Sequence, residues 1–583
     1  MSGIPTDMRA RRQAALRNGV VSNAPKAPSA IPFLTRPQTA LFVALVVVVL
    51  LLGNSATSLW DQDEAAYAGF ARNMLRTGDW VVPHFTWSEV HRKTPLLFWC
   101  IGASFALFGE NEFALRLPAV LAVLLTFVSV ATIGRPVLGA RVSGLAAAIL
   151  ATMILIPNFG KVARPDALVL LFETLAALAM IRVMDRASAR RVWPWTLLFW
   201  TSVALGTLAK GPVILIFTGG LGAWLTVFHP QRRQLLLGLQ PWFFLPLALL
   251  PIWAWGWLAW QRTDGELIKW MLDWYVMRRA HRPVFNQTGP PGYYLVSLFL
   301  TMLPWAFLLP AALMRVWQRR KEPVYCVLAG WLLSGWVVWE FAASKFPPYV
   351  VGAYPAFALL FAYELLDLDA GALWKRRSVR FGLRLAVVVL IMVSLGTLAG
   401  TTFLPDSARL ALAASLPVGL LTIMPMWAMK RLRAGYGDLQ GAMRVLLFGT
   451  AAFLVSVWTL LMPQLEPTRA MSLQVVQRVE SAGPANAQVV LGGHFRKPSL
   501  PFYLGRSYDL IAIDERRLAE LMARADSVPR VLVLTDRAYQ GVRQASEGQE
   551  WHPIRVDGFD FDHSRRSTLW VLVRGRPTHR PTQ

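Results

Sequence analysis

Long apolar runs recur along the chain from Ala40 to Leu461, and they constrain its fold more than any other feature. Of the 583 residues, 55% are hydrophobic and 25 are tryptophan, and the mean hydropathy is +0.42. A helix needs about 20 predominantly apolar residues to cross a bilayer, and only helices or closed barrels satisfy their backbone hydrogen bonds there. The runs therefore predict a polytopic α-helical membrane protein.

Charge indicates which loops face the cytoplasm. The formal net charge of +25 is compatible with nucleic-acid binding, but membrane proteins concentrate lysine and arginine in cytoplasmic loops, so we expect no nucleic-acid partner. The segment 1–38 carries six lysine and arginine residues and a single acid, Asp7. It is predicted to be a cytoplasmic tail and does not resemble a cleavable signal peptide. The two cysteines, Cys100 and Cys326, imply no disulfide framework.

Every cytoplasmic loop is basic if the chain crosses the membrane about thirteen times between residues 39 and 462. The first span is expected near Gln38–Gly53 and a later one at Leu235–Trp260. The apolar run Pro95–Gly109 is too short for a span, and counting it as one would invert every later loop. It is therefore predicted to be a helix on the membrane surface.

From residue 463 to residue 583 the composition becomes that of a soluble domain. Four short apolar segments are expected to be strands: Val489–Gly492, Leu510–Ile513, Val531–Thr535 and Leu569–Val573. With a helix expected at Glu515–Ala525, this pattern is typical of an α/β domain. The topology places the domain outside the membrane. It contains no glycine-rich nucleotide motif and no metal-ligand spacing, which favours a lid or docking module over a catalytic unit.

The segment 55–116, after the first span, is too long for a hairpin between two spans, and long ordered loops are usually functional. Three acids, Asp61, Asp63 and Glu64, open an amphipathic part of it that is expected to lie along the membrane surface. Asp61 and Glu64 have the spacing of a capping box, and acids stabilise a helix N-terminus without any chemistry. Helix capping is therefore the alternative to a catalytic role, and the same applies to Asp166 at another expected helix start.

Several basic residues lie in loops that the topology places outside, where lysine and arginine are normally scarce. They are His91, Arg92, Lys93, Lys161, Arg164, Lys210, Arg278, Arg279, His281, Arg282 and Lys345. Cations in such positions favour anionic ligands, most simply phosphates, and neutralisation of lipid phosphates is the alternative for any one of them. Carboxylates and cations at one membrane face suit a group transfer in which a polar acceptor is activated and a phosphate departs.

Three motifs of the outer segment resemble a family signature. They are Asp63-Glu64-Ala65-Ala66-Tyr67, Thr77-Gly78-Asp79-Trp80-Val81-Val82-Pro83 and Arg92-Lys93-Thr94-Pro95-Leu96-Leu97-Phe98-Trp99. Ala163–Asp166, Ala209–Pro212 and Ser344–Tyr349 follow in the family's order. Together they resemble the membrane glycosyltransferase superfamily of the lipid A 4-amino-4-deoxy-L-arabinose transferases and the protein O-mannosyltransferases. The likeness covers the first ten expected spans. Thirteen spans followed by an outer α/β domain also resemble the layout of the bacterial lipid A branch.

This resemblance implies a GT-C fold and an inverting enzyme of the bacterial inner membrane. The donor would be a sugar on a polyprenyl (undecaprenyl) phosphate, and the acceptor would be lipid A or a related anionic glycolipid at the periplasmic face. The acids expected to act in catalysis are Asp63, Glu64 and Asp166. The residues expected to bind the donor phosphate or the acceptor are Tyr67, Arg92, Lys93, Arg116, Lys210, Arg279, His281, Arg282, Lys345 and Tyr349.

Two positions depart from the family pattern. Ala66 stands where the family has an arginine before the motif tyrosine, and Arg92 stands where it has a glutamate before the motif lysine. A metal site of this branch uses a carboxylate at the second position, so neither a metal nor another cofactor is carried over. The change also leaves the identities of the sugar and of the acceptor open.

Two other functions remain as alternatives. A transporter or flippase of polyprenyl-linked sugars would place polar residues near the membrane midplane, whereas here they gather at one face. A protein O-glycosyltransferase would need a base for a neutral hydroxyl but no docking site for a polyanion. The abundant outer cations favour a phosphorylated glycolipid as the acceptor.

Overall fold

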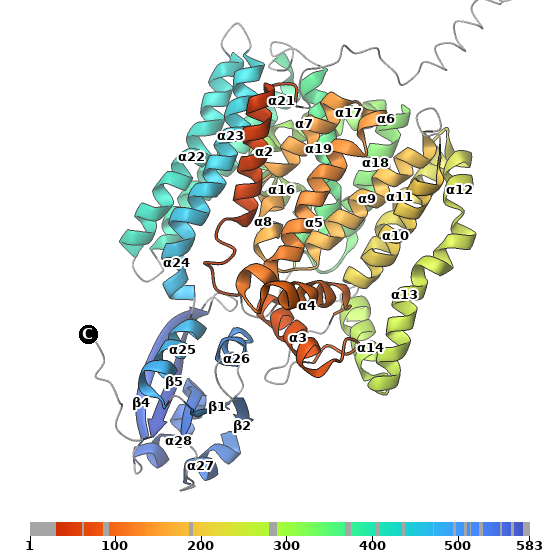
Figure 1. Cartoon of the computed structure of the whole chain (residues 1–583). Coiled ribbons are helices and arrows are strands. Elements are labelled where there is room, and N and C mark those ends of the chain that lie inside the picture. The colour runs from red at the N-terminus through yellow and green to blue at the C-terminus, as the bar shows by residue number, and fades with distance from the viewer. Residues whose placement is uncertain are drawn as a thin grey trace, which may run out of the picture.

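A computed structural model of the chain shows a helix bundle with a small sheet domain at one of its ends (Figure 1). The residues it describes are 31–60, 63–84, 93–185, 191–278, 288–367, 373, 375–402, 407–433, 438–469, 471–484, 486–493, 497–505, 510–513, 515–523, 529–547, 551–560 and 565–574. The helices α3 (Asp63–Thr77) and α4 (Leu96–Phe108) lie across the end of the bundle that faces the sheet domain. We call this the α3–α4 end.

The bundle is built from long apolar helices and from shorter helices between or beside them. They are α2 Arg36–Leu51, α5 Glu112–Thr132, α6 Arg135–Leu138, α7 Ala140–Ala151, α8 Leu155–Asn158, α9 Asp166–Met184, α10 Trp193–Lys210, α11 Val213–Phe228, α12 Arg232–Leu239, α13 Pro241–Arg262, α14 Glu266–Met271, α16 Tyr293–Thr301, α17 Leu309–Arg319, α18 Pro323–Gly335, α19 Tyr354–Leu366, α21 Arg377–Thr401, α22 Ser407–Arg433 and α23 Leu439–Ser456. Within the described ranges, eight helices are long and apolar enough to cross a membrane, or nine if one bent pair is a single span. The polytopic helical class is confirmed, and the count of thirteen stays a prediction.

Several apolar runs of the sequence form broken rather than continuous helices. The bent pair consists of Ala140–Ala151 and Leu155–Lys161, which meet at an angle of 61°. The predicted span Leu235–Trp260 is wrong at its start, because α12 ends before Gln240 and α13 begins after it. Gln240 has a left-handed backbone with φ of 46°. Proline at position 241 disfavours a helical conformation of the preceding residue, which explains the break.

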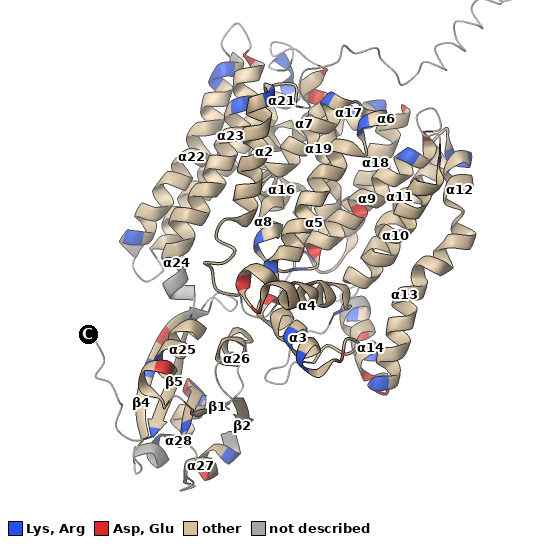
Figure 2. Ribbon diagram, viewed as in Figure 1, with Lys and Arg blue, Asp and Glu red and all other residues tan. Residues whose placement is uncertain are grey.

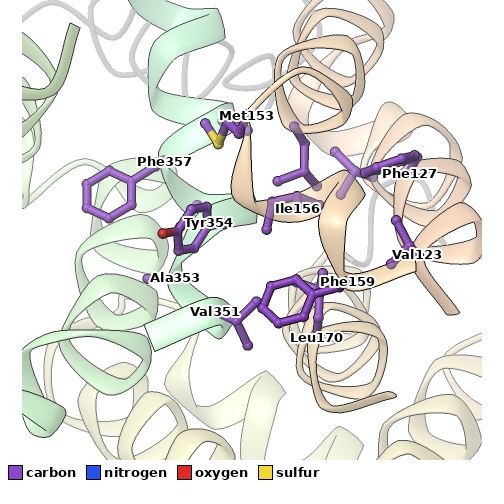
Figure 3. Close-up of a cluster of buried hydrophobic side chains, with 14 of the residues drawn as sticks. Val123, Phe127, Met153, Ile156, Phe159, Leu170, Val351, Ala353, Tyr354 and Phe357 are labelled. Atoms are coloured by element: carbon purple, nitrogen blue, oxygen red, sulfur yellow. The ribbon is translucent and has the colours of Figure 1, made fainter. Parts of the chain in front are cut away.

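The centre of the bundle is α9, whose side chains are almost all buried. Figure 3 shows part of the core, where side chains of α5, of the bent pair, of α9 and of α19 meet. It includes Phe127, Ile156, Phe159, Leu170 and Tyr354. Burial of each large apolar side chain contributes on the order of 1.5–3 kcal/mol, so this packing fixes where the N-terminus of α9 lies. In contrast, α13 exposes Trp242, Trp253 and other large apolar side chains, as a lipid-facing helix would.

Charged residues lie mostly toward the two ends of the bundle and are scarce between them (Figure 2). At the end opposite α3 and α4, Arg315 of α17 pairs with Glu364 and with Asp367, and Arg376 Nη1 lies 3.0 Å from Glu364 Oε2. The Glu364 side chain has no exposed surface. This network joins three neighbouring helical elements, so it is a structural connection.

The helices α3 and α4 cross the end of the bundle because each has a strongly buried face. Tyr67 and Phe70 of α3 pack against Phe98 of α4, with ring centroids 5.5 and 5.1 Å apart. The indole of Trp99 donates to the carbonyl of Trp80 at 2.8 Å. At 13 residues α4 is too short to span a bilayer, which agrees with the predicted surface helix.

The C-terminal domain contains a five-stranded sheet in the order β2-β1-β3-β5-β4. Its elements are α24 Met462–Arg469, α25 Met471–Ala482, β1 Gln488–Gly492, α26 Ser499–Leu504, β2 Leu510–Ile513, α27 Glu515–Ala523, β3 Arg530–Thr535, α28 Asp536–Glu547, β4 Trp551–Asp560 and β5 Arg565–Arg574. Strands β2, β1 and β3 are parallel, and β5 and β4 continue the sheet antiparallel. One apolar core involves α25 and α26, and another involves α27 and α28. The predicted α/β class is confirmed, although β4 was not predicted.

Candidate functional site

Asp63, the first residue of α3, lies in a cluster of polar side chains at the α3–α4 end. The Nζ of Lys93 is 3.3 Å from its Oδ1, and the Tyr67 hydroxyl donates to the same oxygen at 3.1 Å. Lys93 also hydrogen-bonds to the Tyr67 hydroxyl and lies 4.7 Å from the ring centroid. The structure therefore brings together three residues that the sequence proposed for the site.

The pKa of Asp63 reflects two opposing effects. Burial by itself raises the pKa of this carboxyl, because it disfavours the charged form. The charges of Lys93 and Arg164 outweigh burial, together with the hydrogen bonds from Tyr67 and Lys93, and the pKa falls well below its ordinary value. Asp63 is therefore an anion over the whole physiological pH range, with about a third of its side chain exposed.

A second pair of opposite charges lies at the N-terminus of α9. The Nζ of Lys210, the last residue of α10, is 2.6 Å from Oδ1 of Asp166, the first residue of α9. Lys210 also lies 5.4 Å from the ring centroid of Tyr349, which belongs to the 3₁₀ segment Pro347–Ala353. Three further predicted residues are thus brought together from sequence positions far apart.

Arg164 interacts with the acids of both pairs; the sequence singled it out as an outer cation that favours an anionic ligand but gave it no individual role in the site. Its Nε is 3.7 Å from Oδ2 of Asp63, and this buried atom makes no hydrogen bond within the described part of the chain. Burial by itself lowers the pKa of Arg164, but the negative charges of Asp63 and Asp166 outweigh burial, so the pKa is raised above its ordinary value. In the sequence Arg164 stands two residues before Asp166, and Pro165 between them is the N-cap residue of α9.

The predicted roles of Glu64 and Arg116 do not fit the geometry. Arg116 donates two hydrogen bonds to the Glu64 carboxylate, from Nε to Oε1 and from Nη2 to Oε2, each at 2.8 Å. Neither side chain has exposed surface. The Glu64 oxygens also accept the backbone N–H groups of Trp60 and Ala163, each at 3.0 Å. Arg116 donates further to Asn54, Thr57 and Ser58. Because their polar atoms are occupied within the protein, we propose that this pair holds the backbone rather than substrate.

Two of the outer lysines bind backbone carbonyls instead of facing a common site. Lys161 is buried and donates to Leu50 and Leu52 at the C-terminal end of α2, where helix carbonyls lack intrahelical partners. Lys345, also buried, donates to the carbonyls of Trp339, Glu340 and Ala342. These contacts explain both lysines without a ligand, so the predicted substrate-binding role of Lys345 is not supported by its surroundings.

The remaining predicted residues cannot be placed. Asp61, Arg92, Arg279, His281 and Arg282 lie outside the described residues. Their neighbour Arg278 is described, and its Nε pairs with Asp273 Oδ2 at 2.7 Å. For the described residues, no three His, Cys, Asp or Glu side chains gather as metal ligands would, so we assign no ligand set to a metal.

The arrangement suits chemistry on a phosphate ester. Two carboxylates and three basic side chains lie at one end of the bundle, where the charge of Arg164 interacts with both Asp63 and Asp166. Lysine and arginine stabilise phosphate and the negative charge that develops on a phosphate leaving group. Carboxylates of this kind orient or activate the attacking group.

Comparisons with known proteins agree with this description. Residues 92–260 match the family described as dolichyl-phosphate-mannose-protein mannosyltransferase. The chain is similar to undecaprenyl phosphate-alpha-4-amino-4-deoxy-L-arabinose arabinosyl transferases. The one from Serratia proteamaculans is 27% identical over 373 residues, which are 61% of this chain and 64% of the relative. The one from Pseudomonas paraeruginosa is 30% identical over 337 residues, which are 57% and 61%. The similarity spans less than two thirds of these relatives' length.

The fold is also that of solved structures. The crystal structure of ArnT from Cupriavidus metallidurans bound to undecaprenyl phosphate has a TM-score of 0.74 at 19% identity. Its apo state has a TM-score of 0.71 at 18% identity. Both comparisons cover 91% of this chain and 97% of the other. The predicted GT-C fold is therefore confirmed, including its C-terminal domain.

Proposed function

Since this chain belongs to the GT-C superfamily that includes the lipid A 4-amino-4-deoxy-L-arabinose transferases and the protein O-mannosyltransferases, we propose that it is a glycosyltransferase. It moves a sugar from a polyprenyl phosphate to a phosphorylated glycolipid such as lipid A, at the periplasmic face of the inner membrane. The observation that carries this proposal is the cluster in which Arg164 interacts with the acids of the pairs Asp63–Lys93 and Asp166–Lys210.

The cations of this cluster bind the donor phosphate. Lys93 and Lys210 are each about one-fifth exposed, and the Nε of Arg164 retains a free donor position within the described residues. Each charge-assisted hydrogen bond to phosphate contributes about 1.5–3 kcal/mol. The same contacts strengthen as charge builds on the departing polyprenyl phosphate, so they also accelerate the reaction.

The transfer is a single displacement. An acceptor oxygen forms a bond to the anomeric carbon, while the bond between that carbon and the donor phosphate oxygen breaks. The polyprenyl phosphate leaves with the bonding electron pair. Attack from the face opposite the leaving group inverts the anomeric configuration, and NMR of the product linkage measures this outcome.

The electrostatics of Asp63 favour a phosphate as the acceptor. An acid with so low a pKa is a weak base, so it removes a proton from a neutral hydroxyl poorly. A phosphate monoester oxygen is already ionised near neutral pH, and its attack on the sugar requires no proton acceptor. For this acceptor, the role of Asp63 is to hold Lys93, Tyr67 and Arg164 in place and to orient the polar groups of the substrates.

Mass spectrometry tests the proposal directly. Lipid A and surface glycans are compared between cells with the gene, cells without it, and cells carrying Asp63→Asn. The expected result is a sugar mass on lipid A that is present only with the wild-type gene. A sugar lost from surface proteins, with lipid A unchanged, would overturn the choice of acceptor.

A protein O-glycosyltransferase is the second candidate, because the matched family is described by a protein acceptor. It predicts that glycosylated proteins, rather than glycolipids, lose their sugar in cells without the gene. It also requires a base for the acceptor hydroxyl, and the low pKa of Asp63 argues against that role for this residue.

A further inference from the structure

The short helix α26 belongs to two apolar cores at once. All six of its residues, Ser499–Leu504, are buried. Leu500 and Leu504 lie in the core of the C-terminal domain, whereas Phe502 and Tyr503 belong to the core of the helix bundle. The Ser499 hydroxyl also hydrogen-bonds to Ser472 of α25 at 2.7 Å. One element of the C-terminal domain is therefore packed into the α3–α4 end of the bundle.

Tyr503 contacts the backbone just before the acids. Its hydroxyl accepts the N–H of Leu59 at 2.9 Å. The neighbouring carbonyl of Ser58 accepts Arg116, and the neighbouring N–H of Trp60 donates to Glu64. A buried side chain from the C-terminal domain thus completes the hydrogen bonding of the segment that leads into α3.

Arg72 makes a second connection from within α3. Its guanidinium lies 4.0 Å from the centroid of the Phe502 ring and donates to the Phe502 carbonyl at 2.8 Å. It also pairs with Glu110, between α4 and α5, at 2.6 Å. The Arg72 side chain is 5% exposed. Because α3 carries Asp63 at its first turn and Arg72 further along, the helix is held at two places.

We propose that Tyr503, Phe502 and Arg72 are positioning residues, through which the C-terminal domain holds α3 and thereby sets the place of Asp63 relative to Lys93 and Arg164. The domain then acts as a fixed clamp and not as a lid that opens at each turnover. The effect on turnover rests on the proposed glycosyltransferase function, whereas the effect on the backbone at Leu59 does not.

Hydrogen exchange tests the clamp independently of any activity. The full-length protein in nanodiscs is compared with Tyr503→Phe, which removes only the hydroxyl that Leu59 uses. Exchange is measured by mass spectrometry on a peptide containing Leu59 and Trp60. The matched control is Tyr539→Phe, in the same domain, where the ring stacks on Trp570 at 4.0 Å and lies away from α3. We expect faster exchange at Leu59 in Tyr503→Phe only.

Turnover separates positioning from stability. With undecaprenyl phosphate-linked 4-amino-4-deoxy-L-arabinose as the donor probe and lipid A as the acceptor, kcat and KM are measured on monodisperse protein. Tyr503→Phe should lower kcat about three- to tenfold, the equivalent of one neutral hydrogen bond, with the donor KM unchanged. Arg72→Lys keeps the charge but loses the planar stacking contact, and it should show the same division between kcat and KM.

The outcomes are distinguishable. If exchange at Leu59 is equally fast in Tyr503→Phe and Tyr539→Phe, the clamp is overturned. It is also overturned if Tyr503→Phe exchanges faster at Leu59 but has the same kcat as Tyr539→Phe. A wild-type protein that exchanges slowly at Leu59 but transfers no sugar would overturn the proposed function. In that case, faster exchange in Tyr503→Phe would still support the domain as a clamp on this segment.

Discussion

Glu64 and Arg116 form a two-point ion pair with no exposed surface, next to the partly exposed pair of Asp63 and Lys93. Two consecutive acids of one motif therefore have different surroundings. The carboxylate of Glu64 meets only protein groups, and that of Asp63 faces a cluster with exposed cations. Adjacent positions in a motif need not share a role, because successive residues of a helix point about 100° apart.

The first prediction is that Glu64 is structural. Glu64→Gln leaves the Arg116 guanidinium buried without a counter-charge, and breaking a buried pair costs about 3–5 kcal/mol. We expect low yield and a lowered thermal unfolding midpoint in detergent. Asp63→Asn is the matched control and should fold normally. A stable but inactive Glu64→Gln protein would restore the catalytic role that the sequence suggested.

The second prediction concerns donor binding. Lys93→Ala should raise the KM for the lipid-linked donor about tenfold or more, because one charge-assisted contact to phosphate is lost. Lys269→Ala is the control, since this lysine lies over Trp260 in the same region, apart from the cluster. Unchanged donor kinetics in Lys93→Ala would remove Lys93 from the phosphate site.

The third prediction follows from the lowered pKa of Asp63. An acid whose pKa is lower in the folded state than in the unfolded state adds stability above its unfolded value of about 3.9. This contribution is lost as the pH falls through the lower folded value. In Lys93→Ala the first of the two lowering charges is gone, so the folded pKa rises and the contribution shrinks.

Thermal unfolding between pH 3 and pH 7 measures this linkage in detergent. The wild type should lose more stability than Lys93→Ala as the pH falls toward 4 and below, because the contribution of Asp63 that can be lost is larger in the wild type. In the Asp63→Asn background, Lys93→Ala should no longer change the pH dependence of stability. Parallel pH profiles of wild type and Lys93→Ala would show that the two residues are not coupled.

The fourth prediction is topological. Because α24 leads into a sheet domain at the α3–α4 end, reporters inserted after Met462 and near Pro83 must give the same side of the membrane. We expect both to be periplasmic, and a reporter at the N-terminus to be cytoplasmic. A cytoplasmic reporter after Met462 would make Leu96–Phe108 a span and invert the assignment of the outer face.

Much of the fold was predictable because it depends on apolar periodicity. The segments that became β1, β2, β3 and β5 are short apolar runs between polar ones. In contrast, β4 contains Pro553, Gly558 and alternating charges, and pairs with β5 only through tertiary contact. The break at Gln240 was missed although Pro241 marks it, because the apolar residues on both sides predict one span when they are counted together.

The site was predictable in part for a different reason. Motif spacing brought forward Asp63, Lys93, Asp166 and Lys210, which do meet in two pairs. Spacing does not reveal which carbonyls a lysine reaches, so Lys345 resembled a ligand-binding cation until its three backbone acceptors were located. The contact between Tyr503 and Leu59 crosses most of the chain length, and nothing local in the sequence indicates it.

The last prediction separates positioning by Asp63 from helix capping. Asp63→Asn keeps a side-chain acceptor for the helix start, so under capping alone it should cost less than about 1 kcal/mol of stability and leave activity largely intact. If its charge organises Lys93 and Arg164, the variant should fold normally and lose turnover on the order of 10²-fold, the cost of misplaced reacting groups. The donor should still bind, because the cations that hold its phosphate remain.

Asp61→Asn, measured beside it in the same lipid-reconstituted preparation, provides the comparison between two neighbouring acids. We expect Asp61→Asn to be mild. The two variants should differ mainly in kcat, since the ion pairs of Asp63 with Lys93 and Arg164 act on the geometry of the bound substrates and not on helix formation. Equal and mild effects in both variants would mean that the acids only cap α3, and that the pair Asp166–Lys210 is the centre of the chemistry instead.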